Sequence, residues 1–276
     1  MADPAKFDFK TSGNSVAQAY EELLVPRMFE PWSKLLLSEA ELSSGESVLD
    51  VACGPGTVAR MASKMVGPNG KVTAADISPP MLDVARAKPQ APNSAPIEYV
   101  ESPAHPLKAK DASFALTVCQ QGLQFFPEKV EALKEMVRVT GPGGRIAIAV
   151  WGSLQQNPII GEIHAALQET IPSHIADLMK APFSLHDSEE LIALAQEAGL
   201  TNPEVKTLSL PLIFEGGIDQ ATRLLEATPL APQIAELPVE QQTALAASIR
   251  FRLNQFEIGN KCQSTSVSNI LVSQLR

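Results

Sequence analysis

A short apolar run that ends in a carboxylate and a glycine turn constrains this chain more than any other feature. Residues 48–56 read Val-Leu-Asp-Val-Ala-Cys-Gly-Pro-Gly, and a helical pattern begins near Thr57. The glycines at 54 and 56 allow a tight turn and let a ligand lie against bare main chain. The N–H groups at the start of the following helix favour polar or anionic ligand groups. The segment therefore predicts a strand, a turn and a helix that together bind a small polar ligand.

Two carboxylates accompany this turn. Asp50 lies between the strand and the turn, where it can reach a cationic amine, and this pairing suits a nucleotide that carries an amino acid. S-adenosylmethionine is the leading candidate for such a ligand. Asp76 ends the next strand-like run, where a carboxylate can accept hydrogen bonds from both hydroxyls of a ribose along the sheet edge. The alternative for Asp76 is a helix cap before Ser78, but the preceding glycine turn favours the ribose.

Apolar strand-like runs alternate with amphipathic helical patterns in the first half of the chain. Strands are expected at 47–51, 71–76, 97–101, 113–119 and 145–151. Helical patterns begin near Thr57 and Met81, and a third, marked by Val130, Leu133 and Val137, stops at a glycine-rich turn. Strands that alternate with helices at this spacing predict βαβ units and a parallel sheet.

The second half of the chain changes character. Two mostly helical stretches, near 153–185 and 216–260, lie on either side of a strand-like segment at 203–214. A last strand is expected at 264–274. A chain of 276 residues is long for one domain and short for two, so a core domain with an appended cap is expected.

Composition and charge exclude several classes of function. The net charge is −9 and Lys and Arg form no cluster, so nucleic acid is not expected as a partner. Cys53, Cys119 and Cys262 are widely spaced, which favours reduced thiols over a disulfide framework or a metal site. The polar residues 1–10 do not read as a signal peptide, and no apolar run reaches the roughly 18 residues that span a bilayer. We therefore expect a cytoplasmic protein with no metal and no membrane partner.

In combination, these motifs resemble those of the class I S-adenosylmethionine-dependent methyltransferases, in particular the small-molecule branch similar to the ubiquinone/menaquinone-type enzymes. The motifs are 48–57, Ala75-Asp76-Ile77-Ser78 with Met81-Leu82, Asp111-Ala112-Ser113-Phe114, and Thr140-Gly141-Pro142-Gly143-Gly144-Arg145. They stand in the family's order, and the resemblance covers roughly residues 45–151. It implies a Rossmann-like α/β fold: a seven-stranded, mainly parallel sheet with an antiparallel last strand, helices on both faces and a helical cap.

The resemblance also implies a division of the chain. Residues 1–45 would form an N-terminal helical segment that covers the cofactor site, and residues 46–152 would form the Rossmann-like core that binds S-adenosylmethionine. Residues 153–276 would supply two cap insertions, at about 153–185 and 216–260, together with the remaining helix and strands of the core sheet.

A set of cofactor-binding positions carries over from the resemblance. Ile77 and Met81 would face the adenine, although core packing is an equal alternative for Met81. Glu101 departs from the family pattern, in which an Asp usually accepts from the adenine amino group. Tyr20 resembles the aromatic residue that covers the carboxylate end of the cofactor, with packing on an amphipathic helix as the alternative. The full set is Tyr20, Asp50, Ala52, Gly54, Gly56, Asp76, Ile77, Met81, Glu101, Ser102, Cys119 and Gln120.

The methyl acceptor is expected to be a small, apolar or aromatic metabolite chosen by the cap. A general base is needed only if the acceptor must lose a proton. His164, His174 and Gln121 are the candidates for catalysis, against the alternatives of solvated or capping histidines and of plain loop polarity. Apolar cap surfaces could also mediate a homodimer. The residues expected either to line an acceptor pocket or to bury one another are Phe183, Phe214, Leu224 and Leu225.

Two other functions compete with methyl transfer. Gly54-x-Gly56 with Asp76 also satisfies a dinucleotide fingerprint, which would indicate an NAD(P)-dependent oxidoreductase. Against this alternative, Asp50 would face a pyrophosphate unfavourably. The other competitor is a non-methylating member of the same fold that acts as a scaffold or a cyclase, because fold does not determine function.

Overall fold

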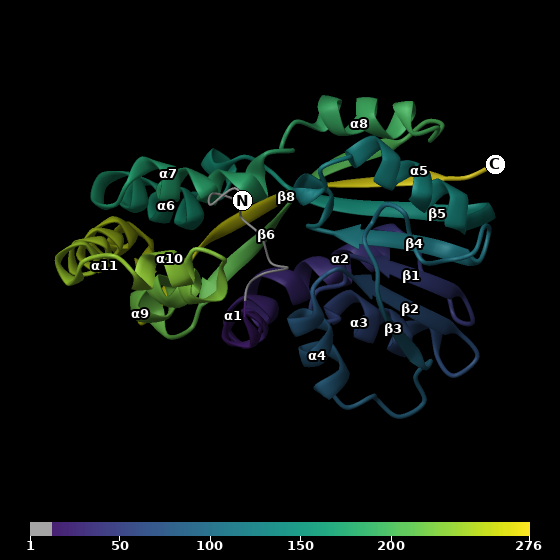
Figure 1. The fold of residues 1–276 in the computed structure, drawn as a ribbon, viewed down its shortest axis with the longest axis horizontal. Helices are drawn as coiled ribbons and strands as arrows, with labels where there is room; N and C mark the ends of the chain where they lie inside the picture. The colour runs from purple at the N-terminus through teal and green to yellow at the C-terminus, as the bar shows by residue number, and fades with distance from the viewer. Residues whose placement is uncertain (1–12) are drawn as a thin grey trace.

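A mixed sheet organises residues 13–276, which are the residues that the computed structural model describes (Figure 1). Residues 1–10, which are not expected to be a signal peptide, lie outside the described part. The strand order is β3-β2-β1-β4-β5-β8-β6, and a short β7 pairs with β8. In that order the strands are β3 (Ile97–Glu101), β2 (Lys71–Asp76), β1 (Ser47–Val51), β4 (Phe114–Gln120), β5 (Thr140–Trp151), β8 (Lys261–Gln274) and β6 (Glu204–Phe214), with β7 at Glu257–Ile258.

The pairing directions confirm the mainly parallel sheet and its antiparallel last strand. β1 pairs in parallel with β2 and β4, and β3 and β5 extend the parallel set outward. β8 runs antiparallel to both β5 and β6. The sequence does not predict β7, because this two-residue strand is exposed and too short to show an apolar alternation.

Helices cover both faces of the sheet. Val48 of β1 packs in one apolar cluster, whereas Leu49 and Val51 pack in another, because successive side chains of a strand face opposite sides. A sheet buried on both faces explains why its central strands read as continuous apolar runs. One face is covered by α2 (Glu30–Glu39), α3 (Thr57–Val66) and α4 (Pro79–Ala87), and the other by α5 (Lys129–Val139) and α8 (Ser188–Glu197) (Figure 1).

The junction between α5 and β5 differs from the sequence prediction. The sequence predicts a turn at 141–144 between the helix and a strand that begins at Arg145. Instead α5 ends at Val139 and β5 begins at Thr140, so the glycine-rich segment is the first part of a long strand. At Gly144 a Cβ atom would lie 2.8 and 2.9 Å from two backbone carbonyl oxygens, so glycine is required for the close strand pairing.

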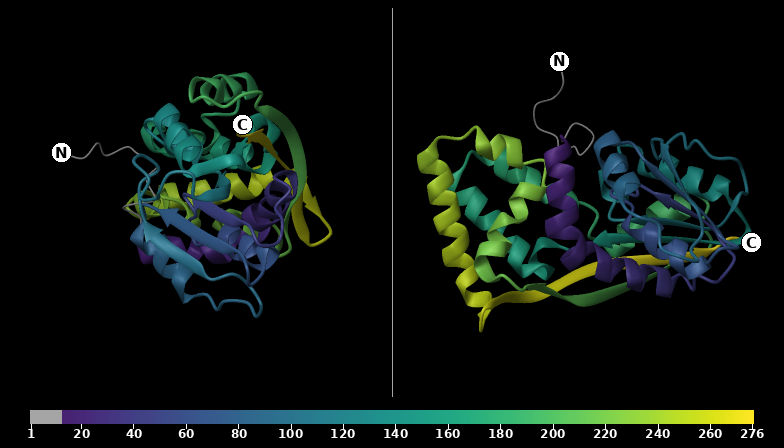
Figure 2. Two further views of the ribbon diagram at one scale, coloured as in Figure 1. Left: turned by 90° about the vertical axis from the view of Figure 1, so that its right-hand side faces the viewer. Right: turned by 90° about the horizontal axis from the view of Figure 1, so that it is seen from below.

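Two helical insertions form a cap beyond one end of the sheet, and the long strands β6 and β8 extend toward it (Figure 2). In the first insertion α6 (Pro158–Thr170) packs against α11 (Val239–Leu253) of the second. Within residues 13–276, no helix combines the length and the hydropathy needed to cross a bilayer. The other elements of this part are η3 (Leu154–Gln156), α7 (Ser173–Ala176), η4 (Asp177–Phe183), α9 (Gly217–Thr222), η5 (Arg223–Ala227), α10 (Ala231–Ala235) and η6 (Asn254–Phe256).

The N-terminal helices lie between the cap and the sheet, and one of them is a π-helix. α1 (Asn14–Ala19) contacts both α4 and η5, and the π-helix η1 (Tyr20–Phe29) follows it (Figure 2). In an α-helix, positions i and i+9 lie about two and a half turns apart, on opposite sides of the axis. The wider winding of η1 instead brings the rings of Tyr20 and Phe29 together, with their centroids 4.7 Å apart.

Gly144→Ala is expected to destabilise the fold more than Gly143→Ala. A methyl group at 144 meets two backbone oxygens, and such overpacking costs up to about 3 kcal/mol. Gly143 has φ +75° and open space around it, so alanine there adds only backbone strain of about 1 kcal/mol. Urea unfolding of the two variants measures the difference. Equal losses, or a larger loss for Gly143→Ala, would contradict the steric role given to Gly144.

Candidate functional site

A cavity of about 530 Å³ opens where the carboxyl ends of the parallel strands meet the cap. Its volume lies within the roughly 300–1,000 Å³ found for small-molecule sites. Every parallel strand from β1 to β5 contributes at its end: Ala52 after β1, Ile77 after β2, Ser102 after β3, Gln121 after β4 and Trp151 on β5. This edge of the sheet is where doubly wound folds bind ligands.

The wall of the cavity is polar at the sheet edge and apolar toward the cap and the N-terminal helices. The sheet edge presents Asp76, Ser102, Gln120 and the backbone of Gly54. The apolar part includes Met28, Phe29, Phe125, Trp151, Met179 and Phe183. One cavity with two such ends can hold two chemically different ligands in contact with each other.

Left-handed backbone conformations shape the turn after β1. Ala52, Gly54 and Gly56 have φ angles of 56°, 53° and 77°. At Gly56 a Cβ atom would lie 3.1 Å from the ring of Tyr99 and 3.2 Å from Ala85, so their close packing requires glycine. Ala52 adopts the same region without being glycine, and backbone strain of this kind concentrates at functional sites. The turn therefore keeps its backbone close to the cavity, which Ala52 and Gly54 both line.

Asp76 links this turn to the end of β2. Its Oδ2 accepts a hydrogen bond from the N–H of Gly54 at 2.7 Å, and its Oδ1 accepts one from the N–H of Ser78 at 2.8 Å. Burial raises the pKa of Asp76 above its usual value, although backbone hydrogen bonds act to lower it. The carboxylate thus bonds the residue that precedes α4 and also lines the cavity, so its placement allows both a helix-terminal role and contact with a ligand.

A second carboxylate, Asp50, lies behind the turn and not in the cavity wall. Its Oδ2 accepts a hydrogen bond from the N–H of Ala59, in the first turn of α3, at 2.9 Å. Burial raises the pKa of Asp50 to about 8, and the charge of Asp76 adds to the effect while Arg60 opposes it. A cationic ligand at this end of the cavity would stabilise both ionised carboxylates.

The structure brings most of the predicted cofactor residues to the cavity. Those that line it are Tyr20, Ala52, Gly54, Asp76, Ile77, Met81, Ser102 and Gln120, together with the catalytic candidate Gln121. Those that do not are Asp50, Gly56, Glu101, Cys119, His164 and His174. Glu101 is exposed to solvent, and Cys119 packs in the apolar cluster beneath α5.

The histidines lie in contrasting settings. His164 is buried on α6, where burial lowers its pKa, and its Nε2 has no hydrogen-bond partner among the described residues. His174 is exposed on α7. His105 lines the cavity, and its Nε2 lies 3.9 Å from Oε2 of Glu128. Sequence reasoning missed His105, although its position shortly after the third strand indicated the cavity edge.

Across residues 13–276, no group of three or more His, Cys, Asp or Glu side chains could hold a metal ion.

Sequence reasoning also missed the apolar residues that the N-terminal helices supply. Leu24 and Phe29 reach the cavity from η1, and their common side depends on π-helical winding that an α-helical pattern does not anticipate. Among the apolar cap residues expected at an acceptor pocket, Phe183 and Leu224 line the cavity. Phe214 does not line it and is buried in the core.

Gln120 fastens the N-terminal helices to the end of β4. Its Oε1 accepts a hydrogen bond from Oγ of Ser33 at 2.7 Å, and its Nε2 donates to the carbonyl oxygen of Phe29 at 2.9 Å. The ring of Phe29 meets that of Trp151 edge-on, with centroids 5.9 Å apart. Both amide atoms of Gln120 are therefore engaged within the protein, and they position one aromatic side of the cavity.

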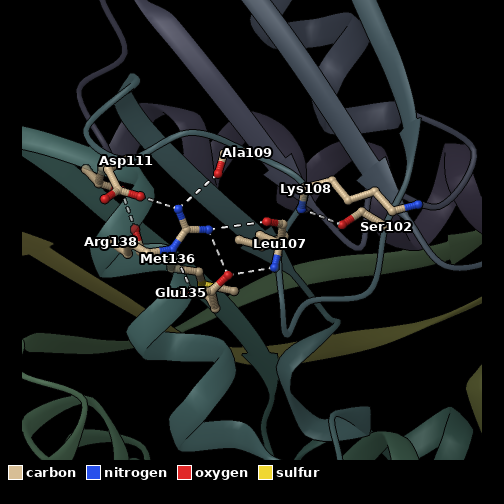
Figure 3. Close-up of polar contacts among 9 residues, drawn as sticks. Ser102, Leu107, Lys108, Ala109, Asp111, Glu135, Met136 and Arg138 are labelled. Atoms are coloured by element: carbon tan, nitrogen blue, oxygen red, sulfur yellow. Dashed lines mark hydrogen bonds and ion pairs between the residues drawn. The ribbon is translucent and has the colours of Figure 1, made fainter.

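The loop after β3, which carries Ser102, is held by α5 (Figure 3). Arg138 donates to the carbonyl oxygen of Leu107 at 3.2 Å and to Oε1 of Glu135 at 2.7 Å. Glu135 in turn accepts from the N–H of Leu107 at 2.7 Å, and its bond with Arg138 holds the pKa of Glu135 below its usual value. The N–H of Lys108 donates to Oγ of Ser102 at 3.0 Å, which connects this ion pair to the cavity wall.

Comparison with known proteins assigns the family. Residues 10–210 match the model of the ubiE/COQ5 methyltransferase family. The chain belongs to this family. It is 32% identical over 199 residues to the ubiquinone/menaquinone biosynthesis C-methyltransferase UbiE of Hahella chejuensis, covering 71% of this chain and 77% of that protein. It is 33% identical over 201 residues to the demethylmenaquinone methyltransferase of Staphylococcus carnosus, covering 68% and 78%.

Solved structures agree with the fold. Phosphoethanolamine N-methyltransferase 2 of Haemonchus contortus, solved with S-adenosyl-L-methionine, gives a TM-score of 0.62 at 17% identity and covers 95% of this chain and 57% of that one. The cyclase SpnF gives a TM-score of 0.53 at 18% identity and covers 90% and 81%. Likeness at such identities shows the fold alone, and it confirms the predicted Rossmann-like class.

Membership of the ubiE/COQ5 family confirms the predicted activity. The chain is an S-adenosylmethionine-dependent methyltransferase that acts on a small molecule. Neither an NAD(P)-dependent oxidoreductase nor a scaffold or cyclase is favoured by the family match.

Asp50→Asn is expected to stabilise the ligand-free protein at alkaline pH. Because the pKa of Asp50 is raised to about 8 in the folded state, the folded protein loses stability as the pH rises from the usual carboxyl range toward 8. An asparagine can still accept from Ala59 and carries no charge. Urea unfolding should show that the gain of the variant over wild type is larger at about pH 9 than at about pH 5, by at least about 1.4 kcal/mol, the equivalent of one pKa unit. A parallel pH profile for the two proteins would contradict the raised pKa.

Arg138→Met is expected to loosen the loop that carries Ser102. The variant keeps an apolar stem but loses charge-assisted hydrogen bonds, each worth about 1.5–3 kcal/mol. Hydrogen exchange of the amides at 103–112 should accelerate about tenfold or more. Arg86→Met, which removes an exposed guanidinium bonded to the carbonyl oxygen of Tyr99, is the control and should leave this loop unchanged. Equal exchange in both variants would contradict the role of Arg138.

Proposed function

We propose that this family member transfers a methyl group from S-adenosylmethionine to an oxygen-bearing aromatic acceptor of the quinone type, bound at the apolar end of the cavity. The observation that carries the proposal is a cavity with a carboxylate-bearing end at the sheet and an aromatic end under the cap. The names of the relatives support this acceptor class, since one is a ubiquinone/menaquinone biosynthesis C-methyltransferase and another a demethylmenaquinone methyltransferase.

The residues at the polar end fit S-adenosylmethionine. Asp76 offers a buried carboxylate to the ribose hydroxyls. The carboxyl groups of Asp50 and Asp76 have raised pKa values, and a cationic ligand would lower them by stabilising the ionised carboxylates. Ile77, Met81 and Tyr20 line the cavity. Ile77 and Met81 would face the adenine, and Tyr20 would cover the amino-acid end of the cofactor from η1. The buried, poorly compensated carboxylates are the feature that favours a sulfonium over an anionic cofactor.

The other predicted cofactor-binding residues would contact the cofactor at the cavity wall, contact it through their backbone, or support the wall without lining the cavity. Ala52, Gly54, Ser102 and Gln120 line the cavity and would touch the cofactor. Gly56 would act by allowing Tyr99 and Ala85 to pack under the turn. For Cys119 we propose only a backbone contact, and for Glu101, whose side chain is exposed, no side-chain contact with the adenine.

The chain's own part in the reaction is to bind, orient and exclude water. When bound, S-adenosylmethionine would supply a methyl group to the nucleophilic atom of the acceptor. The bond between that methyl carbon and sulfur breaks, its electron pair stays on sulfur, and the acceptor loses one proton. Phe29, Trp151 and Phe183 would pack on the acceptor ring and keep water out. Orientation of the reactants in such a site supplies much of the rate. His105 is better placed than His164 to take up a proton inside the cavity.

Three further expectations belong to this proposal. Residues 1–45 would serve as the cover of the cofactor, 46–152 as its core and 153–276 as the acceptor cap with the rest of the sheet. Val239 and Phe251 on α11 are 71% and 84% exposed, and a second copy of the chain would cover them in a homodimer. A cytoplasmic location is supported by three cysteines that are free and buried.

Asp76→Ala is expected to weaken binding of S-adenosylhomocysteine by about 5- to 150-fold, because loss of an ionised acceptor costs about 1–3 kcal/mol. Titration calorimetry measures the change. Asp83→Ala, which removes an exposed carboxylate on α4, is the matched control and should shift the affinity less than about twofold. Equal affinities of wild type and Asp76→Ala would contradict the ribose contact.

The wild-type protein tests the two halves of the proposal separately. Binding of S-adenosylhomocysteine, with NAD and NADP as negative controls, tests the cofactor end. Mass spectrometry of 1,4-dihydroxynaphthalene incubated anaerobically with S-adenosylmethionine tests the acceptor end, and a singly methylated product is expected. Absence of S-adenosylhomocysteine binding would overturn the cofactor site, and binding without any methylated product would overturn the acceptor class.

A further inference from the structure

Gln121, the residue directly after β4, has a strained backbone. Its φ angle is +55°, in the left-handed region that residues other than glycine adopt rarely. Its N–H donates to the carbonyl oxygen of Ala149 at 2.8 Å, which fixes this conformation against β5. Strained residues cluster at ligand sites, where the surrounding structure over-determines them. Position 121 therefore keeps a long polar side chain where glycine would adopt the backbone more easily.

The amide group of Gln121 is only half satisfied. Its Nε2 donates to Oγ of Ser268, a fully buried residue of β8, at 2.9 Å. Its Oε1 is buried and has no hydrogen-bond partner among the described residues. The whole side chain is 6% exposed and lines the cavity. A buried carbonyl oxygen without a donor is unfavourable, and it indicates a position that a ligand completes.

Of the two glutamines that line the cavity, Gln121 is the one with an unpartnered amide oxygen among the described residues. Gln120 lines the same cavity, but its Oε1 and Nε2 are both bonded, to Ser33 and Phe29. Gln120 therefore builds the wall, whereas Gln121 presents an unused acceptor. The Oε1 of Gln121 is buried in the ligand-free chain, but the terminal torsion of a glutamine is broad, so a small rotation that keeps Nε2 at Ser268 turns Oε1 toward a ligand in the cavity.

We propose that Gln121 recognises the methyl acceptor, through a hydrogen bond from a hydroxyl group of the acceptor ring to Oε1. This inference rests on the proposed function and assigns its acceptor specificity to one residue. Ser268 is the positioning residue, because it holds Nε2 and so directs Oε1. The apolar surroundings, including Trp151 and Phe125, strengthen such a bond and penalise an acceptor that cannot donate it.

Binding in the presence of saturating S-adenosylhomocysteine isolates recognition from the chemical step. The probes are 1,4-dihydroxynaphthalene, which can donate a hydrogen bond, and 1,4-dimethoxynaphthalene, which cannot, both titrated anaerobically by calorimetry. Wild type should bind the diol at least about tenfold more tightly than the diether. Gln121→Leu, which preserves the approximate size and removes the acceptor oxygen, should bring this ratio close to one. Its affinity for S-adenosylhomocysteine should stay within about twofold of wild type.

Further variants separate recognition from backbone strain. Gln121→Gly relieves the left-handed strain, so it should melt no lower than wild type and still lose the preference for the diol. Glu41→Gly relieves a similar strain, at φ +50° on the exposed surface, and should keep the wild-type preference. Ser268→Ala should reduce the preference, because Nε2 loses its partner, while the affinity for S-adenosylhomocysteine is retained.

The outcomes distinguish this inference from the function on which it rests. If wild type methylates the diol but Gln121→Leu and Gln121→Gly keep its preference over the diether, Gln121 does not recognise the acceptor and the proposed function stands. If wild type binds 1,4-naphthoquinone more tightly than the diol, and Gln121→Leu abolishes that difference, the amide presents Nε2 instead and the donor requirement is overturned. If wild type binds neither S-adenosylhomocysteine nor any of these acceptors, the proposed function itself fails.

Discussion

The hydrogen bonds from Gly54 and Ser78 to the carboxylate of Asp76 hold together the end of the sheet where ligands bind. They join the turn after β1 to the end of β2 and fix a carboxylate at the cavity wall. Burial raises the pKa of Asp76, and the charge of Asp76 adds to the effect of burial on the pKa of Asp50 behind the same turn. This arrangement suits a cationic ligand and disfavours a pyrophosphate. A cationic ligand at this end of the cavity would lower both raised pKa values, in agreement with the ubiE/COQ5 family assignment.

The apolar end of the cavity depends on a second set of contacts, which attach the N-terminal helices to the sheet. Gln120 bonds Ser33 and Phe29 at the end of β4, and Nε1 of Trp32 donates to Oγ of Ser266 on β8 at 3.0 Å. These bonds seat η1 and α2 between the core and the cap. The apolar end of the cavity is thus built from segments that are far apart in the sequence, and its shape depends on their joint packing.

The contrast between the two ends explains what the sequence could predict. The glycine turn and the place of Asp76 at the cavity were predictable because both are local features: left-handed backbone favours glycine, and the end of a parallel strand lies at the ligand-binding edge of the sheet. The place of Phe29 in the cavity wall could not be predicted from the sequence, because a π-helix brings its ring beside that of Tyr20, whereas an α-helix would separate the two rings. The half-satisfied amide of Gln121 depends on Ser268, which lies on the last strand. The parallel direction of the first five strands was predicted from their alternation with helices. The start of β5 was not predicted, because its glycines indicated a turn.

We propose above that one cavity holds S-adenosylmethionine at the strand ends and an aromatic acceptor under the cap. A crystal structure of the chain with S-adenosylhomocysteine and 1,4-dihydroxynaphthalene tests it most directly. We expect the ribose hydroxyls at the carboxylate of Asp76 and the naphthalene ring among Phe29, Trp151 and Phe183. Density for S-adenosylhomocysteine away from Asp76, or for the ring outside this cavity, would contradict it.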